Sequence, residues 1–86
     1  MRLYRIYTEN KNREDLEHIV GTVFESFSIL EAKGFWKGSA ESSLIIEILD
    51  DANRKLDVEF CAIQIRDWNA QEAVLVTSQI VDTTLI

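Results

Sequence analysis

The feature that most constrains the fold is an amphipathic segment near the start of the chain. Its apolar residues recur three, four and seven positions apart, the spacing of one helical face: Leu16, Ile19, Val20, Val23, Phe24 and Phe27. Acidic residues and His18 fall on the other faces, and Asn12 stands where a helix cap is expected. The sequence therefore predicts a helix that buries one face and leaves His18 in water.

Strand-like segments surround this helix, and a second helical segment precedes the last of them. Strands are expected at 3–8, 28–36, 42–49 and 72–81, where aromatic, β-branched or alternating apolar residues occur. A second helix is expected at about 52–67. This order is typical of an α+β, ferredoxin-like βαββαβ sandwich, in which four antiparallel strands carry both helices on one face. We predict that all 86 residues form one such domain.

The second predicted helix supplies the rest of the core. Leu56, Phe60 and Ile63 are its expected buried face, and Cys61 is expected to be a buried, reduced, small hydrophobic residue. Trp68 follows at the end of this helix. There it either closes the core beneath the helix-to-strand turn or contacts a neighbouring subunit.

Size and charge limit both stability and partners. A core built from 86 residues with a single cysteine is marginal, so self-association to a dimer or trimer is expected. Nine Lys and Arg against fifteen Asp and Glu give a net charge of −6, which disfavours nucleic acid and anionic membranes as partners. Neither a signal-peptide core nor a membrane-spanning run is present in the sequence, so a cytoplasmic location is expected.

Helices on one side of a sheet leave its other face bare. In the predicted arrangement Leu3, Arg5 and Tyr7 of the first strand lie on this bare face. Ile45 and Glu47 of the third strand lie beside them, so Arg5 and Glu47 are expected to pair across the strands. Because Leu3, Tyr7 and Ile45 are apolar, we expect a second copy of the chain to bury the face.

No pattern predicts a catalytic centre. His18 and Cys61 lie in different predicted helices, so neither a local metal-ligand spacing nor a base beside the thiol exists. The run from Gly34 to Ser39 is too short for a P-loop and leads into a strand instead of a helix. We therefore assign no catalytic residue, metal ligand or cofactor.

The segment GFWKGSAE, Gly34–Glu41, is the strongest candidate for a binding site. Phe35 and Trp36 offer stacking surfaces, Lys37 an anion contact and Glu41 a hydrogen-bond acceptor, while Gly38 allows close backbone approach. The combination suits a small, planar, anionic ligand such as a nucleotide. The alternative is a plain β-hairpin in which Gly34 forms a bulge, Gly38 takes a positive φ and the aromatic side chains cover the edge of the core.

The same segment carries a resemblance to known proteins. Its pattern G-x-W-x-G-x-x-E, followed by a strand to Ile48, resembles small bacterial and phage proteins of uncharacterised function with a ferredoxin-like fold. The predicted topology is also similar to that of the PII-like signal proteins, which are trimers that bind nucleotides between subunits. The link between the second and third strands is too short for their signalling loop, and their phosphate-binding basic residues have no counterpart. The resemblance therefore implies an oligomer and does not imply ATP.

Three functions remain open on these residues. The first is a non-enzymatic, homo-oligomeric binding module whose hairpin, with Arg5 and Glu47 nearby, binds a small molecule or a protein. The second is an acidic inhibitor or adaptor of the kind that phages encode, which binds a basic protein. The third is a small enzyme of the dimeric α+β barrel type that uses Tyr7, Arg5 or Glu47, although no acid/base pair is evident.

Overall fold

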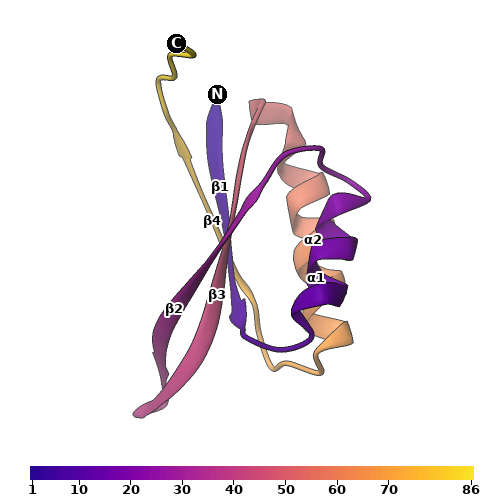
Figure 1. Ribbon diagram of the computed structural model, residues 1–86, viewed down its shortest axis with the longest axis vertical. Coiled ribbons are helices and arrows are strands. Elements are labelled where there is room, and N and C mark those ends of the chain that lie inside the picture. Colours follow the sequence, from indigo (N-terminus) through magenta and orange to yellow (C-terminus); the bar gives the residue numbers. More distant parts are fainter.

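The computed structural model describes residues 1–86 and has the predicted order of elements (Figure 1). These are β1 (Arg2–Glu9), α1 (Arg13–Gly21), β2 (Ser28–Trp36), β3 (Ser39–Asp50), the 3₁₀ helix η1 (Ala52–Arg54), α2 (Lys55–Trp68) and β4 (Leu75–Ile80). The strands form one antiparallel sheet in the order β2-β3-β1-β4. Both helices cover the same face of this sheet (Figure 1). The α+β, ferredoxin-like prediction is confirmed.

The core lies between the sheet and the two helices. Alternate residues of the two central strands point into it, so that Ile6 of β1 lies opposite Ile46 of β3, and Tyr4 opposite Ile48. Twelve apolar residues are buried there: Tyr4, Ile6, Leu16, Val20, Phe24, Leu44, Ile46, Ile48, Val58, Cys61, Ala62 and Ile65. The β-branched residues among them suit the pleated surface of a sheet.

Helix α1 is shorter than its apolar pattern predicts. It ends at Gly21, so Val23, Phe24 and Phe27 lie in the connection to β2, where they still pack against the core. Asn12 adopts the left-handed conformation at the helix start and makes no side-chain cap. Its amide nitrogen instead donates to Oδ1 of Asn69 at 2.9 Å. The expected cap is therefore wrong, and this side chain ties the start of α1 to the end of α2.

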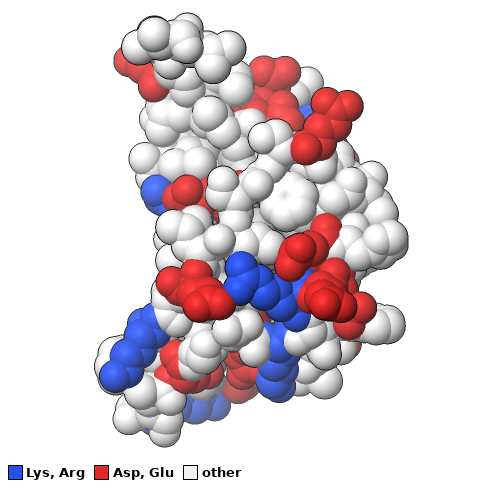
Figure 2. Space-filling model, viewed as in Figure 1, with Lys and Arg blue, Asp and Glu red and all other residues white.

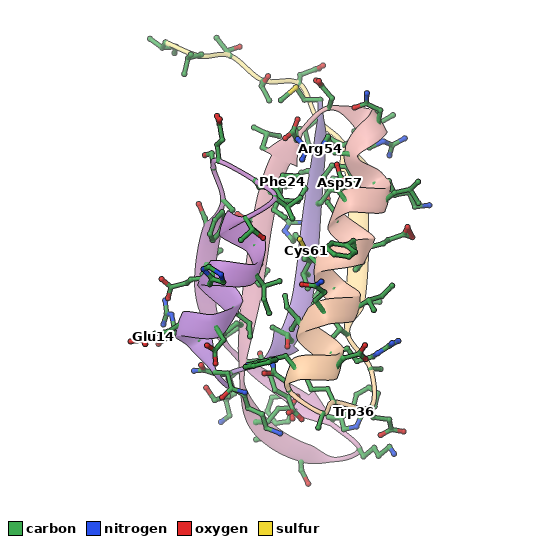
Figure 3. All side chains as sticks on the ribbon, turned by 90° about the vertical axis from the view of Figure 1, so that its right-hand side faces the viewer. Glu14, Phe24, Trp36, Arg54, Asp57 and Cys61 are labelled. Atoms are coloured by element: carbon green, nitrogen blue, oxygen red, sulfur yellow. The ribbon has the colours of Figure 1, made fainter.

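Helix α2 buries a different face from the one predicted. Leu56, Phe60 and Ile63 are 78, 52 and 48% exposed. The buried face is made by Val58, Cys61, Ala62 and Ile65. Two of these side chains, Cys61 and Ala62, are small, and Cys61 points from α2 towards the sheet (Figure 3). Small side chains on this face suit close packing against the isoleucine and leucine side chains of the sheet. The expected burial of Leu56, Phe60 and Ile63 is therefore wrong.

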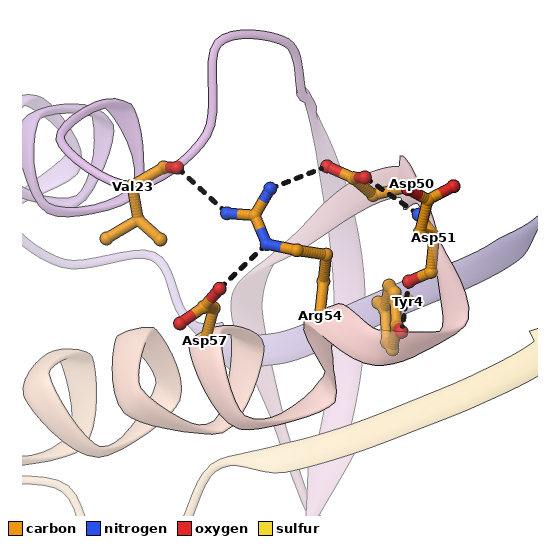
Figure 4. Close-up of polar contacts among 6 residues, drawn as sticks. All are labelled: Tyr4, Val23, Asp50, Asp51, Arg54 and Asp57. Atoms are coloured by element: carbon orange, nitrogen blue, oxygen red, sulfur yellow. Dashed lines mark hydrogen bonds and ion pairs between the residues drawn. The ribbon is translucent and has the colours of Figure 1, made fainter.

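Arg54 joins the start of α2 to the connection between α1 and β2 (Figure 4). Its Nε donates to Asp57 Oδ2 at 2.7 Å, its Nη1 to Asp50 Oδ2 at 3.1 Å, and its Nη2 to the Val23 carbonyl at 3.1 Å. The guanidinium also lies 4.4 Å from the ring centre of Phe24. The hydrogen bond to Asp57 and the neighbouring carboxylates raise the pKa of Arg54. This cluster is structural, because its charges are paired with one another.

The burial pattern of α2 can be tested with two isoleucines two positions apart. Ile65→Ala removes a fully buried side chain and should lower the free energy of unfolding by about 2–5 kcal/mol. Ile63→Ala removes a side chain that is 48% exposed and should cost markedly less. Urea denaturation followed by circular dichroism measures both, and a larger loss for Ile63→Ala would contradict the observed orientation of α2.

Candidate functional site

The sheet face opposite the helices is uncovered. Leu3, Arg5 and Tyr7 on β1 lie in register with Leu49, Glu47 and Ile45 on β3, respectively. At the centre of the face Arg5 Nε donates to Glu47 Oε2 at 2.8 Å, as predicted. This hydrogen bond is the main cause of a raised pKa for Arg5. The bare face thus combines one ion pair with apolar side chains.

The hairpin between β2 and β3 is a tight turn at one end of this face. Lys37 and Gly38 connect the strands with φ angles of 51° and 81°, and positive values at both central residues match the twist of a hairpin. The expected positive φ of Gly38 is confirmed. Gly34 pairs regularly with Glu41, so the expected bulge there is wrong. A Cβ at Gly34 would lie 3.2 Å from Ser43 Oγ, so a larger residue there would require the Ser43 side chain to shift.

A pocket of about 450 Å³ lies beside the hairpin. Three separate parts of the chain line it: the end of β1, the two hairpin strands, and the segment 71–75 that leads into β4. Its aromatic residues are Tyr7, Phe35 and Trp36, and its acidic residues are Glu9, Glu41 and Glu72. We call it the hairpin pocket. Its volume is within the range of about 300–1,000 Å³ that small-molecule sites occupy.

Most polar groups of the hairpin pocket have partners within the protein. Glu9 Oε2 is buried and forms an ion pair with Lys11 Nζ at 3.0 Å. On the pocket wall, Gln71 Oε1 accepts hydrogen bonds from Thr8 Oγ1 and from Asn69 Nδ2. No Lys or Arg side chain lines the pocket, but Glu9 is paired with Lys11 and Glu72 with Lys37, so Glu41 is the carboxylate of the lining that has no basic partner. Such a lining favours a positively charged group and disfavours an anion.

The hairpin residues singled out in the sequence divide between two locations. Phe35, Trp36 and Glu41 line the hairpin pocket together. Lys37 and Gly38 form the turn beyond it, where Lys37 Nζ pairs with Glu72 Oε2 at 3.3 Å and lies 5.8 Å from the ring centre of Trp36. Lys37 therefore already has an anionic partner within the protein.

The remaining predicted site residues lie further along the bare face. Arg5 and Glu47 pair with each other and do not line the hairpin pocket. Tyr7, predicted for a subunit interface, does line it. Glu9 and Glu72 are pocket residues that the sequence reasoning missed. The signal that could have found them is the topology, which brings the end of β1, the hairpin and the start of β4 to one end of the sheet.

Trp68 and His18 lie on the helix side of the molecule. Trp68 is 62% exposed, and its indole nitrogen donates to Asp15 Oδ2 at 3.0 Å, so the expectation that it closes the core is wrong. His18 is exposed, as predicted. No group of three or more His, Cys, Asp or Glu side chains is arranged to hold a metal ion. None of the helices is long and apolar enough to cross a membrane.

Charge is distributed over the surface without a basic patch on the face that Figure 2 shows. Asp and Glu side chains are spread over that face and interleaved with Lys and Arg (Figure 2). The net charge of −6 is therefore not gathered in one place there. Dispersed charge of this kind contributes to solubility.

Comparison with solved structures identifies proteins of the same fold. A DUF3240 family protein from Shewanella baltica OS155 matches with a TM-score of 0.79 at 13% identity, over 99% of this chain and 96% of that one. A phage SAM lyase in its apo state matches with a TM-score of 0.72 at 17% identity, over 91% of this chain and 78% of that one. The de novo designed protein Foldit4 matches with a TM-score of 0.53 at 15% identity, over 94% of this chain and 96% of that one.

The similarity to these three proteins is one of fold alone. No protein-family model matches the sequence, and no curated protein is similar to it. The chain is thus structurally similar to a small uncharacterised bacterial protein and to a phage protein.

Cys61 is the remaining group with reactive chemistry, and its surroundings make it inert. The side chain is fully buried between α2 and the sheet. Burial, reinforced by the charge of Asp57, raises the pKa of its thiol from 9.0 to about 11. Because the thiolate is the nucleophile, this thiol is unreactive near neutral pH.

The raised thiol pKa predicts a loss of stability at alkaline pH. From pH 9.0 towards about 11 the unfolded chain loses the thiol proton while the folded chain retains it, so stability should fall as pH rises through this window. Urea unfolding midpoints of the wild type and of Cys61→Ala, each measured below and above the window, test this. The wild type should lose more; an equal loss in both proteins would contradict it.

Proposed function

We propose that this protein is a homo-oligomeric binding module that holds a small molecule in the hairpin pocket. The observation that carries the proposal is the convergence, around one pocket, of three aromatic side chains with the carboxylate of Glu41, which has no basic partner within the chain. A ligand with a flat ring and a hydrogen-bond donor or positive charge would meet both features.

The charge of the pocket refines the class of ligand. The anionic, nucleotide-like ligand expected from the sequence depends on Lys37, which is paired with Glu72. Because Glu9 and Glu72 are paired with lysines, Glu41 is the unpaired charge of the lining, and a ligand that joins a flat ring to a positive charge fits better. S-adenosylmethionine is such a compound, because it joins an adenine ring to a sulfonium cation. The similarity in fold to a phage SAM lyase makes it the first ligand to test.

Self-association is part of the same proposal. The bare face carries Leu30, Leu49 and Leu75 at 44, 46 and 61% exposure, beside Leu3, Tyr7 and Ile45. Apolar side chains gathered on one face favour burial against a second copy. Tyr7 also lines the hairpin pocket, so a copy that covers the bare face would close one side of the ligand site.

Ligand binding is tested with two compounds that differ in charge. Isothermal titration calorimetry should detect tighter binding of S-adenosylmethionine than of S-adenosylhomocysteine, which keeps the α-ammonium group and lacks the sulfonium charge. Trp36→Ala should weaken binding about tenfold or more, because stacking on an aromatic ring contributes about 1–3 kcal/mol per base. Trp68→Ala is the matched control, because Trp68 lies outside the pocket and should leave affinity unchanged.

Two further results separate the parts of this proposal. Glu41→Gln keeps the size of the side chain and removes its charge, so it should weaken S-adenosylmethionine and leave S-adenosylhomocysteine unaffected. If both compounds bind equally well to the wild type, the cationic preference is wrong. If Trp36→Ala is unfolded by circular dichroism, the tryptophan is structural, and the test then depends on Glu41→Gln alone.

Burial of the bare face is tested by placing a charge on it. Ile45→Asp should convert the oligomer to monomer, because an unpaired carboxylate at an interface costs several kcal/mol. Gln64→Asp, on the exposed surface of α2, is the control and should leave assembly unchanged. Sedimentation velocity measures both, and a wild type that is monomeric at all concentrations would refute the self-association.

A further inference from the structure

A second apolar surface lies on the opposite side of the molecule from the bare face. The outer side of α2 and the adjacent edge strand β4 form a groove of about 520 Å³, which we call the α2–β4 groove. Leu56, Phe60 and Ile63 line it from α2, and Val74 and Val76 from the β4 side. Its two charged residues are Glu59 and Arg66. Three large apolar side chains of one helix thus share a groove that nothing in the same chain fills.

The last residues of the chain are a matching apolar segment without contacts. The tail, residues 82–86, has the sequence DTTLI and extends beyond the end of the sheet (Figure 1). Leu85 and Ile86 are fully exposed. The Val81 amide, which donates to the Met1 carbonyl at 3.1 Å, makes the last backbone hydrogen bond between this end of the chain and the sheet.

Tail and groove agree in spacing. Arg66 lies six residues from Phe60 and ten from Leu56, which are about 9 and 15 Å along a helix. Asp82 lies three residues from Leu85 and four from Ile86, which are about 10 and 13 Å along an extended chain. The one acidic residue of the tail can therefore lie beside the one basic residue of the groove while Leu85 reaches Phe60. Successive side chains of an extended chain point to opposite sides, so Ile86 then faces the wall formed by Val74 and Val76.

Charge also agrees. The Arg66 side chain is 44% exposed, and its Nε is paired only with the adjacent Asp67 at 3.1 Å. A guanidinium carries five N–H donors, so donors remain to bind a second carboxylate. Asp82 can supply that carboxylate.

We propose that the α2–β4 groove binds the tail of a second copy of this chain, running antiparallel to α2. Asp82 lies beside Arg66, Leu85 contacts Phe60, and Ile86 faces Val74 and Val76. A chain cannot fill its own groove in this way. Ile80 pairs with Arg2 at the end of the sheet from which α2 starts, whereas Arg66 lies near the far end of that helix. Asp82 is two residues past Ile80 and reaches only about 7 Å from it.

The inference adds a contact between copies that is separate from burial of the bare face, because the α2–β4 groove lies on the opposite side of the molecule. It is tested by cross-linking two different chains. In a Cys61→Ala background, one chain carries Leu85→Cys and the other carries Phe60→Cys. Mild oxidation of the mixture should join them by a disulfide. Gln64→Cys replaces Phe60→Cys in the control, because Gln64 is exposed on the side of α2 that faces away from the groove and towards Trp68. Equal yields from Phe60→Cys and Gln64→Cys would overturn the proposal.

Charge exchange supplies a second test in the native cysteine background. Arg66→Asp and Asp82→Arg should each raise the concentration at which the oligomer dissociates, and the double variant should restore it. A double variant that assembles no better than the single ones would overturn the pairing.

Failure of this inference can be distinguished from failure of the proposed self-association. A monomeric wild type refutes self-association itself, whereas an oligomer without the Leu85–Phe60 cross-link refutes only the binding of the tail. A disulfide within one chain carrying both cysteines would assign the groove to its own tail and overturn the proposal.

Discussion

The structure depends on one constraint: two helices cover one face of a four-stranded sheet and leave the other face bare. On β1 and β3 the side chains alternate between Tyr4, Ile6 and Ile46 on the covered face and Arg5, Tyr7 and Ile45 on the bare one. The covered side closes into a core of twelve residues, which is small. The bare side keeps an ion pair at its centre and apolar residues around it. A chain of this design gains stability when another surface covers that side.

The same topology brings aromatic and acidic side chains together at one end of the sheet. β1 ends there, β2 and β3 turn there, and β4 begins there, so Glu9, Trp36 and Glu72 meet although they are far apart in the sequence. The turn at Lys37 and Gly38 directs the aromatic strands towards the segment that leads into β4, where Lys37 and Glu72 form an exposed ion pair. Lys37 and Lys11 each pair with a carboxylate of the pocket, so Glu41 is the acidic residue of the lining that stays unpaired. The result is an aromatic pocket with one unpaired carboxylate.

The number of strands and the facing of their side chains were predictable from the sequence, because an alternation of period two leaves little freedom in which residues share a face. The bounds were less so: the last strand was expected at 72–81, whereas β4 is Leu75–Ile80 and residues 72–74 belong to the connection before it. The Arg5–Glu47 pair follows directly from that alternation and the strand order. Helix α2 was less predictable because apolar residues occupy two adjacent faces of it. The face with small residues, Cys61 and Ala62, packs closest to the sheet, whereas the larger Phe60 remains outside.

The hairpin pocket was only half predictable. Trp36 and Glu41 stand out in the sequence between glycines, but Glu9 and Glu72 belong to polar connections that carry no motif. Only their meeting at one end of the sheet gives them a common role. That meeting also changes the expected charge of the ligand from negative to positive. Lys37 is evident in the sequence, but its pairing with Glu72 becomes apparent only in the fold.

Native mass spectrometry of the protein, purified gently from bacterial cells, tests most directly whether an oligomer of this fold holds a small molecule. One spectrum reports both the number of copies and any ligand that stays bound. We expect a dimer or trimer with an added small-molecule mass that is lost in the Trp36→Ala variant. A bare monomer would contradict both the covering of the bare face and the occupied hairpin pocket.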